Sequence, residues 1–302
     1  MPAPLPGPQR IPIGRGPDRR GGSPATGDGR NCALDVLGSC DDIRAPSTIE
    51  EPLVIPPPWF SLLKRFVHNR ITVRGRQSGL AAFRDRISDL VLSTGMKDPV
   101  IVDGGANKGD VTALLLHHFA QPRIHAFEPI SHLAERLTRR FHRYPSVIVH
   151  QFALGECAGQ VDLHITNNVV SSSIFRPSAV NIGVHGAAVS INRSVPVRVV
   201  ALDEHLAEQV DIIKLDLQGY ELCALKGALR QLAGARAVLV EVEFLPMYDG
   251  QADFTGINDF LVGKGYRLHN LYDQWTLPDG QIEAADAIYL NERFYPATGR
   301  NI

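Results

Sequence analysis

Short apolar runs alternate with segments of helical periodicity through most of the chain, and this alternation predicts the fold. Apolar runs rich in β-branched residues predict strands at 100–102, 124–127, 147–152, 212–217 and 237–242. Helical spacing predicts helices at 111–120, 131–143 and 220–232. Strands that are apolar on both sides and separated by helices are typical of a parallel sheet with helices on both faces.

The pattern changes at three places around this repeating unit. Two amphipathic helices are predicted before it, at 59–70 and 80–92, and an antiparallel hairpin after it, with strands at 266–271 and 287–290. Residues 155–210 break the rhythm with a polar segment and two predicted strands, 161–165 and 195–200. A connection of this length at the end of a parallel sheet usually carries a binding function.

The first 58 residues differ in composition from the rest. They hold 12 of the 21 prolines and many glycines, and such a sequence buries too little apolar surface to offset the entropy of ordering. We therefore expect a flexible tail at 1–58, N-terminal helices that pack on the core at 59–97, and the main domain at 98–295.

Charge and cysteine content narrow the classes of partner. The formal net charge of −1 gives no electrostatic footprint for nucleic acid. No apolar stretch is long enough to span a bilayer, and the N-terminus does not resemble a secretion signal. The four cysteines form neither a CxxC pair nor a zinc-type spacing with histidine. We expect a cytoplasmic protein that acts on a small molecule, and its oligomeric state stays open.

The most informative segment is VIVDGGANKGDVT, residues 100–112, in which a buried strand enters a glycine turn that opens a helix. Glycines there allow positive φ angles and a close approach of the backbone to a ligand. A phosphate-binding P-loop needs Lys-Ser or Lys-Thr after its last glycine, whereas Asp110 and Val111 follow Gly109. ATP and GTP are therefore disfavoured.

The acids near this turn separate the remaining cofactors. A dinucleotide site needs G-x-G-x-x-G with no carboxylate facing the pyrophosphate, but here the spacing differs and Asp103 ends the strand. An acid beside the loop suits a cofactor with a cationic ammonium group and no phosphate, which describes S-adenosylmethionine (SAM). Glu128 ends the next strand, where a carboxylate can accept hydrogen bonds from both ribose hydroxyls.

Seven segments together resemble the FkbM-type family of SAM-dependent methyltransferases. They are Asp103–Gly109, Phe127–Pro129, Ala153–Gly155, Ser171–Ser173, Asp211–Glu221, Leu225–Ala228 and Glu241–Tyr248. The resemblance covers residues 98–292, and its most specific element is the Lys-x-Asp-x-x-Gly-Tyr-Glu pattern at 214–221. The chain departs from the family pattern mildly at Gly104, which occupies a variable position.

The resemblance implies the Rossmann-like class I methyltransferase fold: an α/β structure with a mostly parallel seven-stranded sheet, an antiparallel C-terminal hairpin and helices on both faces. It also implies O-methyl transfer to a hydroxyl of a sugar, glycolipid or polyketide-type acceptor. The cofactor-binding residues that we expect are Asp103, Gly104, Gly105, Ala106, Asn107, Gly109, Thr112, Glu128, Pro129, Ala153, Leu154, Ser172 and Ser173.

Three carboxylates are candidates for the catalytic, acceptor-side role. Methyl transfer is an in-line displacement that depends on positioning, and a hydroxyl acceptor also needs a group that takes its proton. Asp216 at a strand end is the first candidate, and helix capping is its structural alternative. Glu243 is favoured over Glu241 because it lies nearer the end of its strand. Glu221 fits a catalytic role and a role in the first helical turn equally well.

Several alternatives stay open. A divalent cation between Asp216 and Glu243 is one, but no His–carboxylate cluster completes such a site, so no metal ligand is assigned. His132 and His185 are alternative general bases, and Tyr248 is a candidate wall of the acceptor pocket. The rival functions are an NAD(P)-linked oxidoreductase, which the loop spacing opposes, and a SAM-binding scaffold without activity, which would lack the acceptor-side acids.

Overall fold

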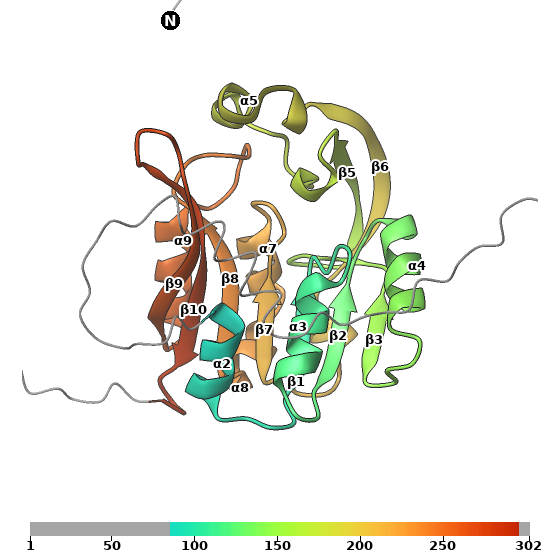
Figure 1. Ribbon diagram of the computed structural model, residues 1–302, viewed down its shortest axis with the longest axis vertical. Coiled ribbons are helices and arrows are strands. Elements are labelled where there is room, and N and C mark those ends of the chain that lie inside the picture. The colour runs from blue at the N-terminus through green and yellow to red at the C-terminus, as the bar shows by residue number, and fades with distance from the viewer. Residues whose placement is uncertain (1–84, 296–302) are drawn as a thin grey trace, which may run out of the picture. The chain divides into compact units, whose positions relative to one another are not determined.

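The computed structural model describes residues 85–295, in which a seven-stranded sheet has the order β3-β2-β1-β7-β8-β10-β9 (Figure 1). Neighbouring strands are parallel from β3 to β8, and β10 is antiparallel to both β8 and β9. The strands are β1 (Val100–Gly104), β2 (Arg123–Phe127), β3 (Val147–His150), β7 (Ile212–Leu215), β8 (Ala237–Glu243), β9 (Tyr266–Thr276) and β10 (Ile282–Asn291). The predicted sheet and its C-terminal hairpin are confirmed.

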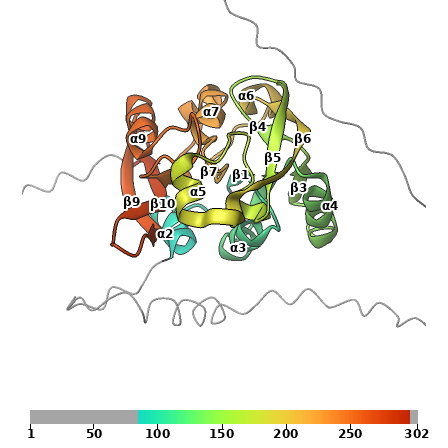
Figure 2. The same cartoon turned by 90° about the horizontal axis from the view of Figure 1, so that it is seen from above.

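Helices cover both faces of this sheet (Figure 2). One face carries α2 (Arg86–Thr94), α3 (Asp110–His118) and α4 (Ser131–Arg140). The other carries α6 (Leu202–His205), α7 (Glu221–Lys226), α8 (Leu229–Gly234) and α9 (Phe254–Gly263). Apolar side chains of the helices pack on the strands in a separate cluster on each face. None of the helices within residues 85–295 is long and apolar enough to cross a membrane.

The insertion builds a second sheet beyond the carboxyl ends of the main strands. Its order is β4-β6-β5, and the predicted strands at 161–165 and 195–200 are confirmed as parts of β5 and β6. Figure 1 shows α5 above the main sheet, next to these strands. The elements are β4 (Ala153–Leu154), β5 (Gly159–Thr166), β6 (Ile191–Val200), α5 (Ala179–His185), and the 3-10 helices η1 (Val169–Ser171) and η2 (Gly186–Val189).

Several elements differ from the sequence prediction, and α6 and the two 3-10 helices were not predicted. The predicted helix at 220–232 is two helices, α7 and α8, and the predicted strand at 147–152 is β3, after which β4 joins the second sheet. α9 was not predicted, because Gly256 and Gly263 lower its helix propensity; Asp253 nevertheless caps it by accepting a hydrogen bond from the backbone N–H of Gly256 at 2.9 Å. α5, also unpredicted, begins after the cap Ser178. The predicted helix at 59–70 and the tail at 1–58 lie outside the described residues.

The predicted helix at 80–92 is found as α2, which begins at Arg86. Asp85 precedes it, and its carboxylate accepts a hydrogen bond from the backbone N–H of Ser88 at 2.9 Å. Ile87 and Leu90 are buried among the apolar side chains on one face of the sheet. The described part of the 59–97 segment therefore packs on the core.

Between α7 and α8, the backbone of Gly227 lies close to that of Gly155. A Cβ atom on Gly227 would lie 2.0 Å from the carbonyl oxygen of Gly155. We therefore expect Gly227→Ala to lower the free energy of unfolding by about 1–3 kcal/mol, since the overpacked backbones must move apart. Gly263→Ala is the matched control: Gly263 ends α9 and has open space around its Cβ position, so alanine should stabilise by about 0.4–1 kcal/mol. Urea denaturation measures both, and equal effects would contradict the steric explanation.

Candidate active site

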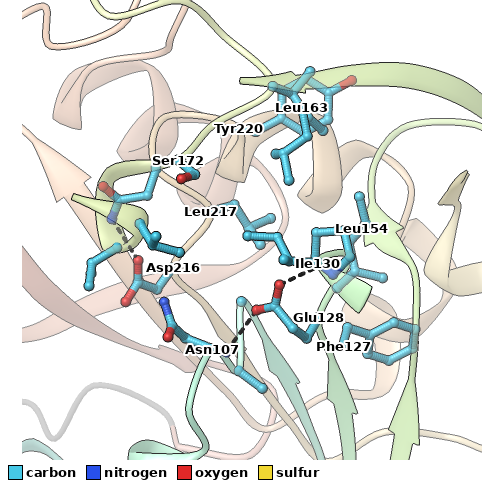
Figure 3. Close-up of a pocket in the computed structure, with 18 of the residues that line it drawn as sticks. Asn107, Phe127, Glu128, Ile130, Leu154, Leu163, Ser172, Asp216, Leu217 and Tyr220 are labelled. Atoms are coloured by element: carbon cyan, nitrogen blue, oxygen red, sulfur yellow. Dashed lines mark hydrogen bonds between the residues drawn. The ribbon is translucent and has the colours of Figure 1, made fainter. Parts of the chain in front are cut away.

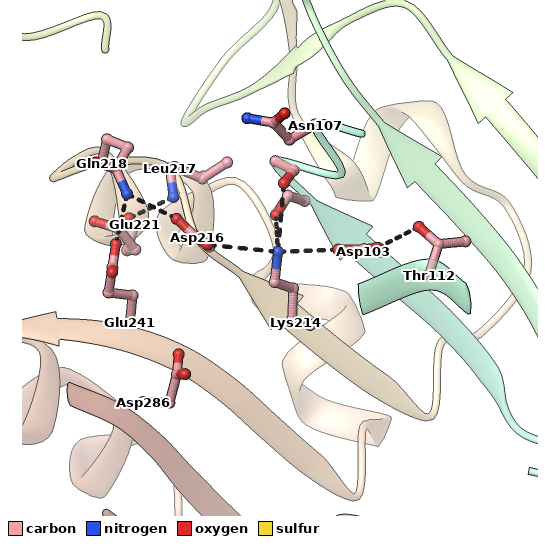
Figure 4. A network of polar contacts seen from close by, with 12 residues as sticks. Asp103, Asn107, Thr112, Lys214, Asp216, Leu217, Gln218, Glu221, Glu241 and Asp286 are labelled. Atoms are coloured by element: carbon pink, nitrogen blue, oxygen red, sulfur yellow. Dashed lines mark hydrogen bonds and ion pairs between the residues drawn. The ribbon is translucent and has the colours of Figure 1, made fainter. Parts of the chain in front are cut away.

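A buried ion pair joins the two central strands at the point where the direction of strand order reverses. Asp103 on β1 and Lys214 on β7 are register partners, so their side chains lie on the same side of the sheet. Lys214 Nζ lies 3.0 Å from Asp103 Oδ1, and Thr112 donates a hydrogen bond to Asp103 Oδ2 at 2.6 Å (Figure 4). Burial alone would lower the pKa of Lys214, but the charges of Asp103 and Asp216 raise it above its usual value.

The glycine turn is shaped by contacts within the protein. Gly105 has a φ of +72°, and a Cβ there would lie 1.9 Å from the carbonyl oxygen of Asp216. Gly109 has a φ of +83°, and its Cβ would collide with Leu137 and Phe141. The expected positive φ angles are thus present, but the close approach at Gly105 is to the end of β7 and not to a ligand. Lys214 Nζ also donates to the Gly104 carbonyl oxygen at 3.1 Å, which fixes the turn against β7.

A cavity of about 260 Å³ opens beside this turn (Figure 3). Its apolar side includes Ile130, Leu154 and Leu163, and its polar side includes Glu128 and Asp216. The predicted cofactor residues in its lining are Gly105, Ala106, Asn107, Glu128, Pro129, Ala153, Leu154 and Ser172. The predicted residues outside the lining are Asp103, Gly104, Gly109, Thr112 and Ser173.

Glu128 is oriented by two backbone donors. Its Oε2 accepts from the N–H of Asn107 and its Oε1 from the N–H of Ile130, both at 2.9 Å. Burial raises the pKa of Glu128 to about 7, although both backbone donors act in the opposite direction. Each oxygen keeps a further lone pair, so this carboxyl can still accept a hydrogen bond from a ligand in the cavity.

A second cavity of about 320 Å³ adjoins the first, and Val170, Asp216 and Gln218 line both. It lies at the ends of β7, β8 and β10 beneath the insertion, and its lining includes Tyr248, the candidate wall of the acceptor pocket. Its acidic side chains are Asp216, Glu241, Glu243, Glu283 and Asp286. Among residues 85–295, no group of three or more His, Cys, Asp or Glu side chains is arranged to hold a metal ion.

Gln218 links the acids in the wall between the cavities. Its Nε2 lies 2.9 Å from both Asp216 Oδ1 and Glu241 Oε2 and donates to them, and its Oε1 accepts from the hydroxyl of Tyr248 at 2.8 Å. Gln218 adopts a φ of +56°, a conformation that is uncommon outside glycine. The turn after β7 therefore holds the Gln218 amide where it fixes the position of Asp216.

The other candidate catalytic acids have different surroundings. Glu221 lies outside the lining of both cavities, and its Oε1 accepts from the N–H of Leu217 at 2.5 Å, so it supports the turn before α7. Glu243 lies at the end of β8 in the lining of the second cavity. Burial raises the pKa of Glu243, and the charges of Glu221 and Asp216 raise it further.

The two histidines that are alternative general bases lie in different surroundings. His185 lines the second cavity, where its Nε2 lies 2.6 Å from Glu283 Oε1. His132 lines neither cavity.

Sequence analysis did not single out several residues of the second cavity, among them Arg86, Asn181, Glu283 and Asp286. Asp286 gave a detectable signal, since it is an acid inside a predominantly apolar strand, where it is the register partner of Glu241. Arg86 pairs with Asp286 and Asp273 across the sheet. These contacts join segments about 200 residues apart in the chain, and no local pattern predicts them.

The Methyltransferase FkbM domain matches residues 103–268. The chain is 26% identical over 175 residues to the 2-O-methyltransferase NoeI of Sinorhizobium fredii, an alignment that covers 54% of the chain and 71% of NoeI. It is 26% identical over 159 residues to the hexuronic acid methyltransferase AglP of Haloferax volcanii, covering 51% of the chain and 59% of AglP. A crystal structure of Methyltransferase FkbM from Methylobacillus flagellatus superimposes with a TM-score of 0.43 at 17% identity, covering 65% of this chain and 44% of that one.

The buried Asp103–Lys214 pair predicts that loss of Lys214 destabilises the protein far more than loss of an exposed lysine. Lys214→Met leaves Asp103 charged and buried, so it should lower the free energy of unfolding by about 3–5 kcal/mol. Lys226→Met, at the exposed end of α7, should change it by less than about 0.5 kcal/mol. Guanidinium denaturation compares the two variants, and a loss at position 214 no larger than that at 226 would refute a structural role for the pair.

Proposed function

The chain belongs to the FkbM family of methyltransferases, and we propose that it transfers a methyl group from SAM to a hydroxyl of a sugar, glycolipid or polyketide-type acceptor. The observation that supports this most directly is the pair of adjoining cavities with Asp216 in their common wall. A methyl donor in one cavity and an acceptor in the other would meet beside this carboxylate. Such positioning supplies much of the rate acceleration for a displacement reaction.

The first cavity has a chemistry that fits SAM. Glu128 has lone pairs for the ribose hydroxyls, the apolar side chains Ile130, Leu154 and Leu163 suit a flat adenine ring, and Asp216 provides negative charge for a cationic group. When bound, SAM supplies an electrophilic methyl group. Asp103 acts indirectly in this proposal, because it is fully buried and holds Lys214 and the glycine turn in place.

Asp216 is the proposed proton acceptor for the acceptor hydroxyl. Its side chain is partly exposed to both cavities, and Gln218 donates to one of its oxygens at 2.9 Å. Lys214 Nζ lies 4.0 Å from its other oxygen. The hydroxyl proton moves to Asp216 as the acceptor oxygen forms its bond to the methyl carbon.

The related enzymes support a sugar as the acceptor. One is named a 2-O-methyltransferase and the other a hexuronic acid methyltransferase, and the alignments cover just over half of this chain. The family match at 103–268 includes the parallel strands of the sheet from Asp103 onward and all residues that line the first cavity. Arg86, Glu283 and Asp286 of the second cavity lie outside that match, so the acceptor of this chain has to be inferred from its own residues.

The role proposed for Glu128 predicts a loss of cofactor affinity. Glu128→Ala should weaken binding of S-adenosylhomocysteine about 10–100-fold in isothermal titration calorimetry, because hydrogen bonds to a charged acceptor contribute about 1.5–3 kcal/mol. Glu135→Ala, on the exposed side of α4, should leave binding unchanged. Binding of NAD in place of S-adenosylhomocysteine by the unmodified protein would refute the proposed cofactor.

The role proposed for Asp216 predicts a loss of turnover. Asp216→Asn keeps the shape of the side chain but removes its basicity, so kcat should fall about 10²–10⁴-fold with the sugar that the unmodified enzyme methylates best. Because Asp216 also provides negative charge for the cationic group of the cofactor in this proposal, S-adenosylhomocysteine should bind up to about tenfold more weakly, a smaller effect than that on kcat. Asp98→Asn, at an exposed position before β1, is the control and should retain full kcat. Unchanged kcat in Asp216→Asn would exclude it as the proton acceptor.

A further inference from the structure

The second cavity has more negative than positive groups in its lining. Five carboxylate residues line it, together with Arg86 and His185. Both of these bases are already engaged, since Arg86 pairs with Asp286 and Asp273 and His185 with Glu283. The remaining acids are Asp216, Glu241 and Glu243.

These three acids have little compensation from the protein. Asp216 and Glu241 share the neutral amide of Gln218, and the nearest ammonium group to Asp216 is that of Lys214 at 4.0 Å. Burial raises the pKa of Glu241 well above its usual value, and the charge of Asp216 raises it further. Burial raises the pKa of Glu243 to about 9, the charges of Glu221 and Asp216 raise it as well, and a hydrogen bond with the side chain of Gln251 acts in the opposite direction. Positive charge brought by a ligand would relieve this repulsion.

Two buried oxygens in the cavity lining have no hydrogen-bond partner among the described residues. They are Oε2 of Glu243, whose residue is 6% exposed, and Oδ1 of Asn181, whose residue is 2% exposed. Buried polar atoms are normally paired, and leaving one unpaired costs free energy. Glu243 comes from the end of β8 and Asn181 from α5, so a ligand between the sheet and the insertion could donate to both.

We propose that the second cavity binds an amino sugar through its protonated amino group, held by Glu243 with Asn181 and the acids around Gln218. The inference rests on the proposed function, in which this sugar is the methyl acceptor. An ammonium group offers three donors and one positive charge in a small volume, which matches the two unpaired acceptors and the uncompensated acids. A uronic acid would bring a further acidic group beside Glu241 and Glu243, and a neutral sugar would not stabilise their ionised forms as an ammonium group does.

The described residues of the second cavity suit a metal ion less well than an ammonium group. Ca²⁺ and Mg²⁺ take six or more oxygen ligands, several of which are water molecules in Mg²⁺ sites. No group of three or more suitable side chains among residues 85–295 is arranged to hold such an ion. An organic ammonium needs only hydrogen-bond acceptors at the places where Glu243 and Asn181 provide them.

Equilibrium binding separates these ligands without requiring turnover. The full chain, saturated with S-adenosylhomocysteine, is titrated at neutral pH with the methyl glycosides of glucosamine, N-acetylglucosamine, glucose and glucuronic acid, and affinities are measured by saturation-transfer NMR. The glucosamine derivative should bind at least about tenfold more tightly than the other three, because its interaction is with charged groups. The preference should weaken as the pH rises and the amino group of the sugar loses its proton.

Glu243→Gln keeps the side-chain shape and should reduce the preference for the amino sugar by about tenfold. Glu292→Gln, at an exposed position after β10, is the matched control. Asn181→Ala is a second variant that should weaken amino-sugar binding, should Glu243→Gln fail to fold. Equal binding of glucose, stronger binding of glucuronic acid, or an amino-sugar preference that both cavity variants retain would overturn the proposal.

Two further arms separate this inference from the proposed function. Titration with Mg²⁺ or Mn²⁺ alone should give no binding that depends on Glu243, and such binding would assign the site to a metal and overturn the proposal. Methyl transfer is then assayed on the same four glycosides with SAM. If the methyl glycoside of glucose is methylated and the amino sugar is not preferred, the proposed amino-sugar site is wrong and the proposed methyltransferase function stands. If the amino sugar binds tightly but none of the four glycosides is methylated, the amino-sugar site stands and the proposed sugar methylation is contradicted.

Discussion

The ion pair between Asp103 and Lys214 is the constraint on which both cavities depend. It joins β1 to β7, the adjacent strands between which the chain changes the direction of its crossovers. Parallel α/β sheets open a crevice at such a point. Lys214 holds the carbonyl oxygen of Gly104 and lies near Asp216, while Asp103 holds Thr112 at the start of α3. One buried charge pair thus lies between the glycine turn that lines the first cavity and Asp216 in the wall that the two cavities share.

Hydrophobic periodicity predicted the sheet and most of its helices because strands with two buried faces carry a strong local signal. Local pattern also located the cavity lining around Asn107 and Glu128. It could not show that Asp103 faces Lys214 and not the cavity, because that depends on the register between strands more than 100 residues apart. The helix predicted at 220–232 is interrupted around Gly227, where the backbone of Gly155 comes too close for a side chain, and this long-range contact is not visible in the local sequence.

The second cavity was the part of the candidate site that the sequence predicted least well. Glu243 followed from its place at a strand end, but Arg86 and Asn181 come from a helix before the sheet and a helix in the insertion. Neither sequence segment distinguishes a side chain that faces a cavity from one that faces solvent. Glu221 was ambiguous from sequence, and the structure puts it against the backbone of Leu217, where it supports the turn that carries Gln218.

The two cavities draw their walls from different parts of the fold. The first is built largely from β1, β2, β7 and the turns that follow them, and the second takes many of its residues from α2, the insertion and the C-terminal hairpin. The insertion also contributes to the first cavity through Leu163, Val170 and Ser172, whereas α2 and the hairpin line the second cavity alone. Substitutions on α2 and the hairpin can therefore reshape the second cavity while the walls of the first stay as they are.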